Sequence, residues 1–207
     1  ALAVLLPEVD CLFGIAQPEK YHPEIDTGVH VLMAMNAAAD MGSDSRVVFA
    51  MLLHDLGKGL TPREKLPSHI GHEKSGVPLV RNVCERLRVP GAYQKLALIV
   101  CELHLRCHRL MEARPATVLS LIEDADLLRR PERVDEFLQA CEADYRGRKG
   151  FEERPYPQAG RLRTALQAAL TIRASDVPTQ GLEGWQIGEK LRQGRVAAIS
   201  DALSPAG

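Results

Sequence analysis

The residues best suited to chemistry stand at the end of an apolar run, VVFAMLLHDLGKG, which covers residues 47–59. A histidine beside an aspartate at the end of a hydrophobic helix is costly to bury unless both side chains have partners. Imidazole nitrogens and carboxylate oxygens suit divalent first-row metal ions, and a mixed set with open positions suits metal-assisted hydrolysis. On a regular helix His54 and Asp55 would point about 100° apart. We therefore expect them to converge where Gly57 lets the last turn unwind.

Further ligands must come from other helices. His30 lies in the apolar stretch GVHVLMAM, where a polar ring needs a partner. One more carboxylate is expected from a late helix, and the sequence offers Asp144 in LQACEADYRGR and Asp124 or Asp126 in LIEDADLL. A single histidine on an apolar face is usually a hydrogen-bonded core residue, but beside a histidine–aspartate pair we favour the metal-site interpretation.

Two other stretches carry metal-binding residue types. In CELHLRCH, Cys101 with His104, or His104 with His108, share a helix face and could chelate zinc. Structural zinc usually takes ligands from separated knuckles, so we expect Cys101 in the core, His104 toward the cleft and His108 outside it. In HIGHE we expect His69 to be a solvated loop residue, and His72 to stand where a helix N-terminus presents amides to an anion.

The bulk composition is that of an ordinary globular protein. The 207 residues are 45% hydrophobic, 26% charged and only 4% aromatic, which favours helices over sheets. A formal net charge of −1 argues against binding nucleic acid or membrane by a broad basic field alone. No apolar stretch reaches the roughly 20 residues that span a bilayer, so we expect a soluble protein without a membrane partner. The five scattered cysteines, without a secretory signal, predict reduced thiols in the cytoplasm.

Helical spacing of apolar residues recurs along nearly the whole chain, and strand signals are almost absent. Capping and terminating residues delimit helices over 26–42, 43–57, 69–89, 91–113, 116–130, 131–148, 161–177 and 182–203. Glycine, proline and charge dominate 147–160, which is typical of a linker or long functional loop. The sequence predicts an all-α fold, with a main bundle of about six helices over residues 1–150 and a linker with a helical appendage over 151–207.

A histidine on one helix, a His-Asp pair ending the next and an aspartate on a later helix resemble the HD superfamily of metal-dependent phosphohydrolases. Four stretches in order sharpen the resemblance: PEVDCLFGIAQPEKYHPEIDTGVHVL, LLHDLGKG, HIGHE and CEADYRGR. Together they look like the carboxyl-terminal HD domain of bacterial multifunctional CCA-adding tRNA nucleotidyltransferases. The resemblance covers nearly the whole chain and implies an HD-superfamily helical bundle with its helical tail.

The resemblance also implies a metal centre and a phosphohydrolase activity. Metal ligation is carried over to His30, His54, Asp55 and a late aspartate, for which the EAD sequence near a helix end favours Asp144 over its rival Asp126. The ion is a divalent metal, with nickel favoured and magnesium or manganese as alternatives. The implied substrates are 2′,3′-cyclic nucleotides, 2′-nucleotides and phosphomonoesters.

The catalytic candidates are His54, Asp55, Lys58, His72 and His104. A bound ion would activate water and polarise a phosphoryl oxygen, and Lys58 would supply a point charge for the phosphate. His72 and His104 are candidates for a second-metal ligand, a general acid or a phosphate donor.

The expected partners follow from the same resemblance. The nucleotidyltransferase head, with its glycine-rich loop and paired carboxylates, is missing from these residues, so we do not expect this chain alone to add CCA to tRNA. Partners are tRNA, through the intact enzyme, and small nucleotide phosphoesters, with a homodimer as a further candidate. The competing class is a non-catalytic module that positions tRNA or mediates dimerisation.

The helical tail carries a candidate RNA-contacting surface. Its arginines are Arg161, Arg163, Arg173, Arg192 and Arg195. They could grip tRNA phosphates, although a solvated amphipathic face explains them slightly better from the sequence alone. Trp185, the only tryptophan, is expected to be a packing anchor.

Overall fold

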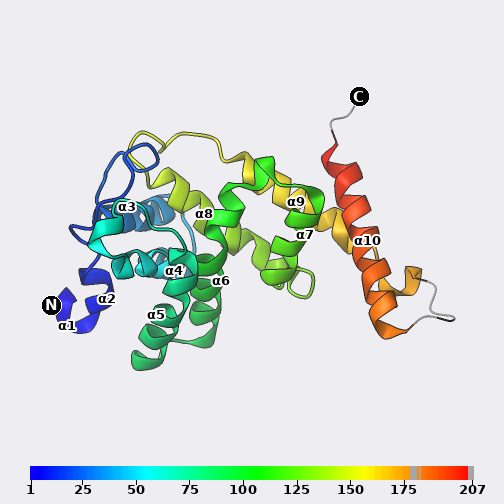
Figure 1. Ribbon diagram of the computed structural model, residues 1–207, viewed down its shortest axis with the longest axis horizontal. Coiled ribbons are helices and arrows are strands. Elements are labelled where there is room, and N and C mark those ends of the chain that lie inside the picture. The colour runs from blue at the N-terminus through cyan, green and yellow to red at the C-terminus, as the bar shows by residue number, and fades with distance from the viewer. Residues whose placement is uncertain (178–180, 182, 205–207) are drawn as a thin grey trace. The chain divides into compact units, whose positions relative to one another are not determined.

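The computed structural model describes residues 1–177, 181 and 183–204, and within them the chain is α-helical without strands, as predicted (Figure 1). The α-helices are α1 (Leu2–Leu5), α2 (Pro7–Asp10), α3 (Thr27–Asp40), α4 (Ser45–Leu53), α5 (His72–Arg86), α6 (Gly91–His108), α7 (Pro115–Asp124), α8 (Val134–Arg146), α9 (Pro157–Thr171) and α10 (Gly184–Leu203). Short 3₁₀ helices are η1 (Leu56–Leu60), η2 (Arg63–Lys65), η3 (Leu110–Glu112), η4 (Pro131–Arg133) and η5 (Ala174–Asp176). In this described part of the chain, no helix combines the length and the apolar character that a membrane span requires.

The chain forms two compact units that interleave along the sequence. The first contains residues 1–108 and 135–156, and the second contains residues 109–134 together with the chain from residue 157 onward. In the second unit, α7, α9 and α10 pack on one another. The boundary expected near residue 150 marks a change in amino-acid composition. The division by packing differs from it, because residues 109–134 pack with the carboxyl-terminal helices.

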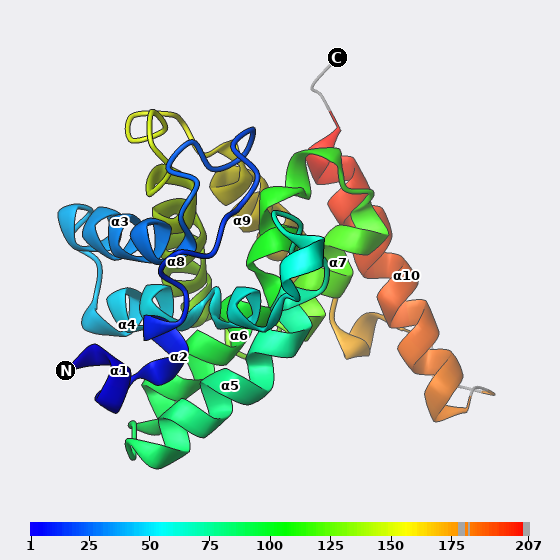
Figure 2. The same ribbon diagram turned by 60° about the vertical axis from the view of Figure 1, so that its left-hand side comes forward.

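The first unit brings α3, α4, α5, α6 and α8 together. α4 packs against both α3 and α6, while α5 packs against α6 and η1, and Figure 2 shows α3 and α4 side by side. The end of α8 meets α3 so closely that a Cβ added at Gly147 would lie 2.5 Å from the Cα of Ala34. Val31, Leu53, Val100 and Phe137 are among the fully buried side chains of this unit.

Side-chain caps fix where α3 and α4 begin. The carboxylate of Asp26 accepts a hydrogen bond from the backbone N of Val29 (2.9 Å), and that of Asp44 accepts one from the N of Arg46 (2.9 Å). α3 ends at Asp40, two residues before Gly42, whose φ is +68°. The start and end signals of α3 were therefore sufficient to predict its bounds closely.

Several predicted helices differ at their ends. α6 ends at His108, with η3 following, where the pattern continued to residue 113. α9 begins at Pro157, inside the expected loop, because proline is tolerated in the first helical turn. The expected helix over 182–203 corresponds to α10, and its first position, 182, lies outside the described residues.

Candidate metal centre

The chain changes from α-helix to 3₁₀ helix at His54 and Asp55. α4 ends at Leu53 rather than at Gly57, and η1 begins at Leu56. His54 Nδ1–H donates to the carbonyl of Met51 (2.8 Å), the carbonyl to which Asp55 N would bond if the helix continued. Leaving the regular helix lets two adjacent side chains point into one centre, as the sequence required.

Gly57 has a different role from the one expected. A Cβ at this position would lie 2.0 Å from the carbonyl oxygen of His72 and 2.7 Å from the N of Gly76. Glycine is therefore needed because η1 lies directly against α5, and not because the turn unwinds there. This close approach brings His72 beside Asp55.

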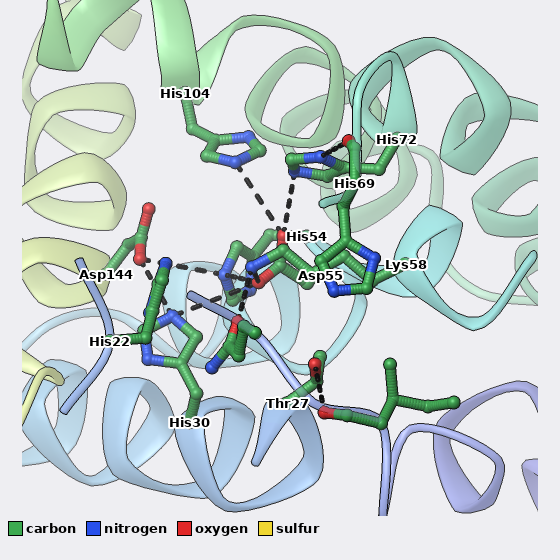
Figure 3. Close-up of polar contacts among 12 residues, drawn as sticks. His22, Thr27, His30, His54, Asp55, Lys58, His69, His72, His104 and Asp144 are labelled. Atoms are coloured by element: carbon green, nitrogen blue, oxygen red, sulfur yellow. Dashed lines mark hydrogen bonds and ion pairs between the residues drawn. The ribbon is translucent and has the colours of Figure 1, made fainter. Parts of the chain in front are cut away.

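The four side chains that the sequence offered as metal ligands, from three segments, lie close together (Figure 3). His30 Nε2 of α3 lies 2.9 Å from Asp144 Oδ1 of α8, and His54 Nε2 lies 3.1 Å from Asp55 Oδ2. The cross distances are 3.9 Å from His30 Nε2 to Asp55 Oδ2 and 3.7 Å from His54 Nε2 to Asp144 Oδ1. Ligand atoms bonded to one ion at about 2.1 Å stand about 3.0 to 3.4 Å apart. The ligand atoms of His30, His54 and Asp144 lie within 4.8 Å of one another and could hold a metal ion, with Asp55 beside both histidines.

Asp55 also faces a second group of donors through its other oxygen. Oδ1 lies 3.2 Å from His72 Nε2 of α5 and 3.8 Å from His104 Nε2 of α6. The three side chains are buried, and their ligand atoms lie within 4.8 Å of one another. Asp55 is thus placed to bridge two neighbouring positions.

The orientation of the histidine rings is set by acceptors behind them. Nδ1–H donates to a backbone carbonyl in three of the rings: Met51 for His54 (2.8 Å), His69 for His72 (2.7 Å) and Val100 for His104 (3.0 Å). In the fourth ring, His30 Nδ1 lies 3.0 Å from Glu24 Oε1 without being aligned as a hydrogen bond. In the three rings held by backbone carbonyls, a proton on Nδ1 leaves a lone pair on Nε2.

These lone pairs face carboxylate oxygens rather than donors. The Nε2 atoms of His54 and His72 have no hydrogen-bond partner although both rings are buried. Acceptor atoms that face one another repel unless a cation or a proton lies among them. The donor set and its orientation therefore fit a divalent metal.

The electrostatics of the centre keep its carboxylates ionised. Burial raises the pKa of Asp55, but His54 and Lys58 outweigh burial and hold that pKa well below its usual range. Burial likewise opposes ionisation of Asp144, whose pKa is held low by His108 and Arg148. Burial lowers the pKa of His104 to about 3, which keeps this ring neutral. Anionic carboxylates and neutral imidazoles are the forms that bind metal.

Lys58 and His54 respond to the same negative charge. Lys58 Nζ lies 2.7 Å from Asp55 Oδ2 and donates to Gln17 Oε1 (2.7 Å). Burial lowers the pKa of His54, yet Asp55 and Asp144 outweigh burial and raise it. A proton on His54 Nε2 therefore competes with a metal ion for one lone pair.

Three residues beside the centre were missed or misplaced from the sequence. His108, expected outside the cleft, has Nε2 2.6 Å from Asp144 Oδ2, and its Nδ1 lies 3.0 Å from the hydroxyl of Tyr156. His22 and Glu24 also adjoin the site, with His22 Nδ1 2.9 Å from Glu24 Oε1. One turn of α6 separates His104 from His108, and this spacing was the available signal for His108.

The rival aspartates lie elsewhere. Asp126 belongs to the second unit, where it has a φ of +58° and contacts Arg129 (3.4 Å) and Arg133 (3.9 Å). Asp124 ends α7 in the same unit. Of the three candidates, the structure brings Asp144 together with the two histidines.

Of three further residues singled out in the sequence, the structure differs from the expectation for His69 and Trp185 and agrees with it for Cys101. His69 is buried rather than solvated, because Thr61 Oγ1 lies 2.7 Å from its Nδ1 and the Ala16 carbonyl 3.0 Å from its Nε2. Cys101 is a core residue as expected, and burial raises the pKa of its thiol, which argues against a zinc thiolate. Trp185 is 70% exposed and is not a packing anchor.

Comparison with known proteins agrees with this geometry. The family model described as "HD domain" matches residues 27–145, so the chain belongs to the HD domain family of metal-dependent hydrolases. The matched range contains His30, His54, Asp55 and Asp144. No solved structure matches the chain.

Curated relatives indicate which members of the HD domain family this chain resembles. The chain is 56% identical to the Multifunctional CCA protein of Thioalkalivibrio sulfidiphilus over 199 residues, which cover 96% of this chain and 49% of the relative. It is 52% identical to the Multifunctional CCA protein of Nitrosococcus oceani, over 98% of this chain and 50% of the relative. It is 49% identical to the Multifunctional CCA protein of Acinetobacter baumannii, over 97% of this chain and 48% of the relative. The chain thus spans about half the length of the curated relatives it matches, and the resemblance inferred from its four motifs is confirmed.

Proposed function

We propose that the chain is a metal-dependent phosphohydrolase domain that acts on 2′,3′-cyclic nucleotides, 2′-nucleotides and phosphomonoesters. The observation that carries this proposal is the convergence of buried Nε2 lone pairs on the oxygens of Asp55 and Asp144. Membership of the HD domain family supports the reaction class. The relatives are named Multifunctional CCA protein, and we propose a setting in tRNA CCA addition and repair, within a longer cytoplasmic protein.

In this proposal His30, His54, Asp55 and Asp144 hold the metal ion, with nickel favoured and magnesium or manganese as alternatives. A divalent ion there supplies Lewis acidity toward the phosphoryl group and activation of water. Lys58 has three N–H donors, of which Asp55 and Gln17 occupy two. The third is available to a phosphate oxygen of the substrate.

His72 and His104 are better suited to a second metal position than to acid catalysis. Both commit Nδ1–H to a backbone carbonyl, and both direct Nε2 at Asp55 Oδ1. Burial lowers the pKa of His104 to about 3, so at neutral pH the one proton of this ring stays on Nδ1 and Nε2, which faces Asp55, has none to donate. We therefore assign the pair to the binding of a second ion beside Asp55.

The direct test is metal-dependent hydrolysis by the purified chain. The protein is stripped with a chelator, restored with nickel, manganese, magnesium or cobalt, and assayed with 2′,3′-cyclic AMP. We expect activity only after restoration, and at least about a 100-fold loss in His54→Ala, because a direct ligand matters more than the outer partners worth 10- to 100-fold. His69→Gln is the matched control, since His69 is a buried histidine whose nitrogens contact Thr61 and Ala16.

Absence of activity with every restored metal, or equal activity in His54→Ala, would overturn the enzymatic proposal. The result would then favour the alternative, a non-catalytic module that positions tRNA or mediates dimerisation.

Some tail arginines already have structural contacts in the second unit: Arg192 donates to Ser120 (2.9 Å) and Glu123 (3.3 Å) of α7, and Arg161 donates to the carbonyl of Ala113 (3.3 Å). If this surface grips phosphates, binding of tRNA by the chain must weaken as salt is raised.

A further inference from the structure

The segment before α3 places two buried side chains against the metal centre. Glu24 Oε1 lies 3.0 Å from His30 Nδ1, and the Glu24 side chain is only 2% exposed. Gln17 donates from Nε2 to Glu24 Oε1 (3.3 Å) and accepts from Lys58 (2.7 Å). Both residues precede the range that the family model matches, which begins at residue 27. The segment therefore contacts both the predicted metal ligand His30, through Glu24, and the predicted phosphate donor Lys58, through Gln17.

Glu24 acts on the one ring whose tautomer the backbone does not set. In the other three histidines of the centre, a backbone carbonyl holds the proton on Nδ1. For His30 the other tautomer, with the proton on Nε2, also has an acceptor, because Asp144 Oδ1 lies 2.9 Å from Nε2 and would accept that proton. That alternative tautomer would have no lone pair for a metal ion.

We propose that Glu24 is a positioning residue that keeps the His30 proton on Nδ1 and so presents the Nε2 lone pair to the metal. This inference rests on the metal-binding role proposed above. Glu24 is suited to it because His22 and Gln17 also direct donors at Oε1 (2.9 and 3.3 Å), which fixes the carboxylate in place. A carboxylate behind a ligating imidazole orients the ring and increases its basicity.

The backbone beside Glu24 is strained in a way that aims it inward. Asp26 N donates to the Glu24 carbonyl (2.7 Å), closing a three-residue turn around Ile25, whose φ is +61°. A positive φ is an outlier for a β-branched residue, and this form of the turn is rare. The Ile25 side chain is 45% exposed, so burial of that side chain does not require the conformation. Gln17 N holds the turn by donating to the Ile25 carbonyl (2.7 Å).

The first experiment measures metal affinity and tautomer in Glu24→Gln. Apo protein is titrated with Co²⁺ and binding is followed by visible absorption, with an expected loss of about 10- to 100-fold. Nitrogen-15 NMR of the apo protein reports which His30 nitrogen carries the proton, and we expect Nδ1 in the wild type and a shift toward Nε2 in the variant. Glu8→Gln is the matched control, because Glu8 is a carboxylate paired with Arg86 (2.8 Å), and it should bind Co²⁺ like the wild type.

The second experiment separates positioning from stability through Ile25→Gly. Glycine adopts a positive φ without strain, so we expect an unchanged or higher midpoint of thermal unfolding together with weaker Co²⁺ binding, since the freed turn no longer holds Glu24. Wild-type affinity and tautomer in Glu24→Gln would overturn the inference. Parallel losses of affinity and thermal stability in Ile25→Gly would also overturn it. If the wild type itself binds no Co²⁺, the proposed function fails instead, which distinguishes the two failures.

Discussion

Asp55 is the residue on which the metal centre depends most, because its two oxygens face different sets of partners. Oδ2 contacts His54 (3.1 Å) and Lys58 (2.7 Å), and Oδ1 contacts His72 (3.2 Å). Such a buried anion is tolerated only with close partners of positive charge. A carboxylate with both oxygens committed cannot be replaced by a neutral isostere without loss at both positions.

The choice between the two late aspartates gives a matched pair of mutations. We expect Asp144→Asn to weaken Co²⁺ binding at least about 100-fold, because it removes a ligand charge within 2.9 Å of His30 Nε2. Asp126→Asn should leave affinity unchanged and alter the free energy of unfolding by no more than about 0.5 kcal/mol, since asparagine tolerates the positive φ of that position. Calorimetric metal titration and urea unfolding measure the two effects. Loss of metal binding in Asp126→Asn would contradict this assignment.

Residue types predicted the centre of the site but not its surroundings. A histidine on an apolar face and a His-Asp pair at a helix end are visible in the sequence because burying them is costly. The preference for Asp144 over Asp126 rested on the resemblance, because both residues follow apolar helical patterns and differ only in where their helices pack. Glu24 could not be predicted, since it lies in a loop and its orientation depends on the strained turn at Ile25.

At the scale of elements, the contact between η1 and α5 positions the second group of donors. The predicted helix over 43–57 had no sequence signal to end at Leu53, because the stop comes from the hydrogen bond of His54 to the Met51 carbonyl. The resulting 3₁₀ helix lies on α5, with Gly57 directly against the His72 carbonyl. Helical periodicity is local and predicts α4 well, whereas this break depends on packing between elements.

Gly57→Ala tests that contact. The added methyl would lie 2.0 Å from one backbone atom and 2.7 Å from another, so η1 and α5 must separate, and we expect the free energy of unfolding to fall by about 3 kcal/mol. Metal affinity should fall as well, because His72 moves away from Asp55. Gly91→Ala is the control: its Cβ meets nothing within 4 Å at the start of α6, and it should be neutral or stabilising by up to about 1 kcal/mol. Urea unfolding that finds the two variants alike would refute the proposed close contact.

At the scale of the whole molecule, the metal centre closes the first unit across a long stretch of chain. His30 and Asp144 lie 114 positions apart in sequence, and the intervening residues 109–134 belong to the second unit. Composition predicted a boundary at the glycine- and proline-rich stretch near residue 150, because linkers usually have that character. The interleaved division could not be predicted, since which helix packs against which depends on complementary surfaces and not on the period of each helix.

Metal binding should therefore stabilise the two units unequally. The proposed ligands all belong to the first unit, and an ion present at 100 times its Kd adds about 2.7 kcal/mol to the stability of the state that binds it. Hydrogen exchange of the apo and Mn²⁺-bound chain should show amides of α3 and α8 exchanging up to about 100-fold more slowly, if they exchange through opening of that unit, with α10 unchanged.

In His54→Ala the added protection of α3 and α8 should disappear, because the ion loses a direct ligand. Equal protection of α10 in the wild type would mean that both units open in one cooperative step, and the long-range closure between His30 and Asp144 would then stabilise the entire chain. Absence of protection in α3 and α8 would contradict the centre itself, since an ion bridging these helices must be released before either can open.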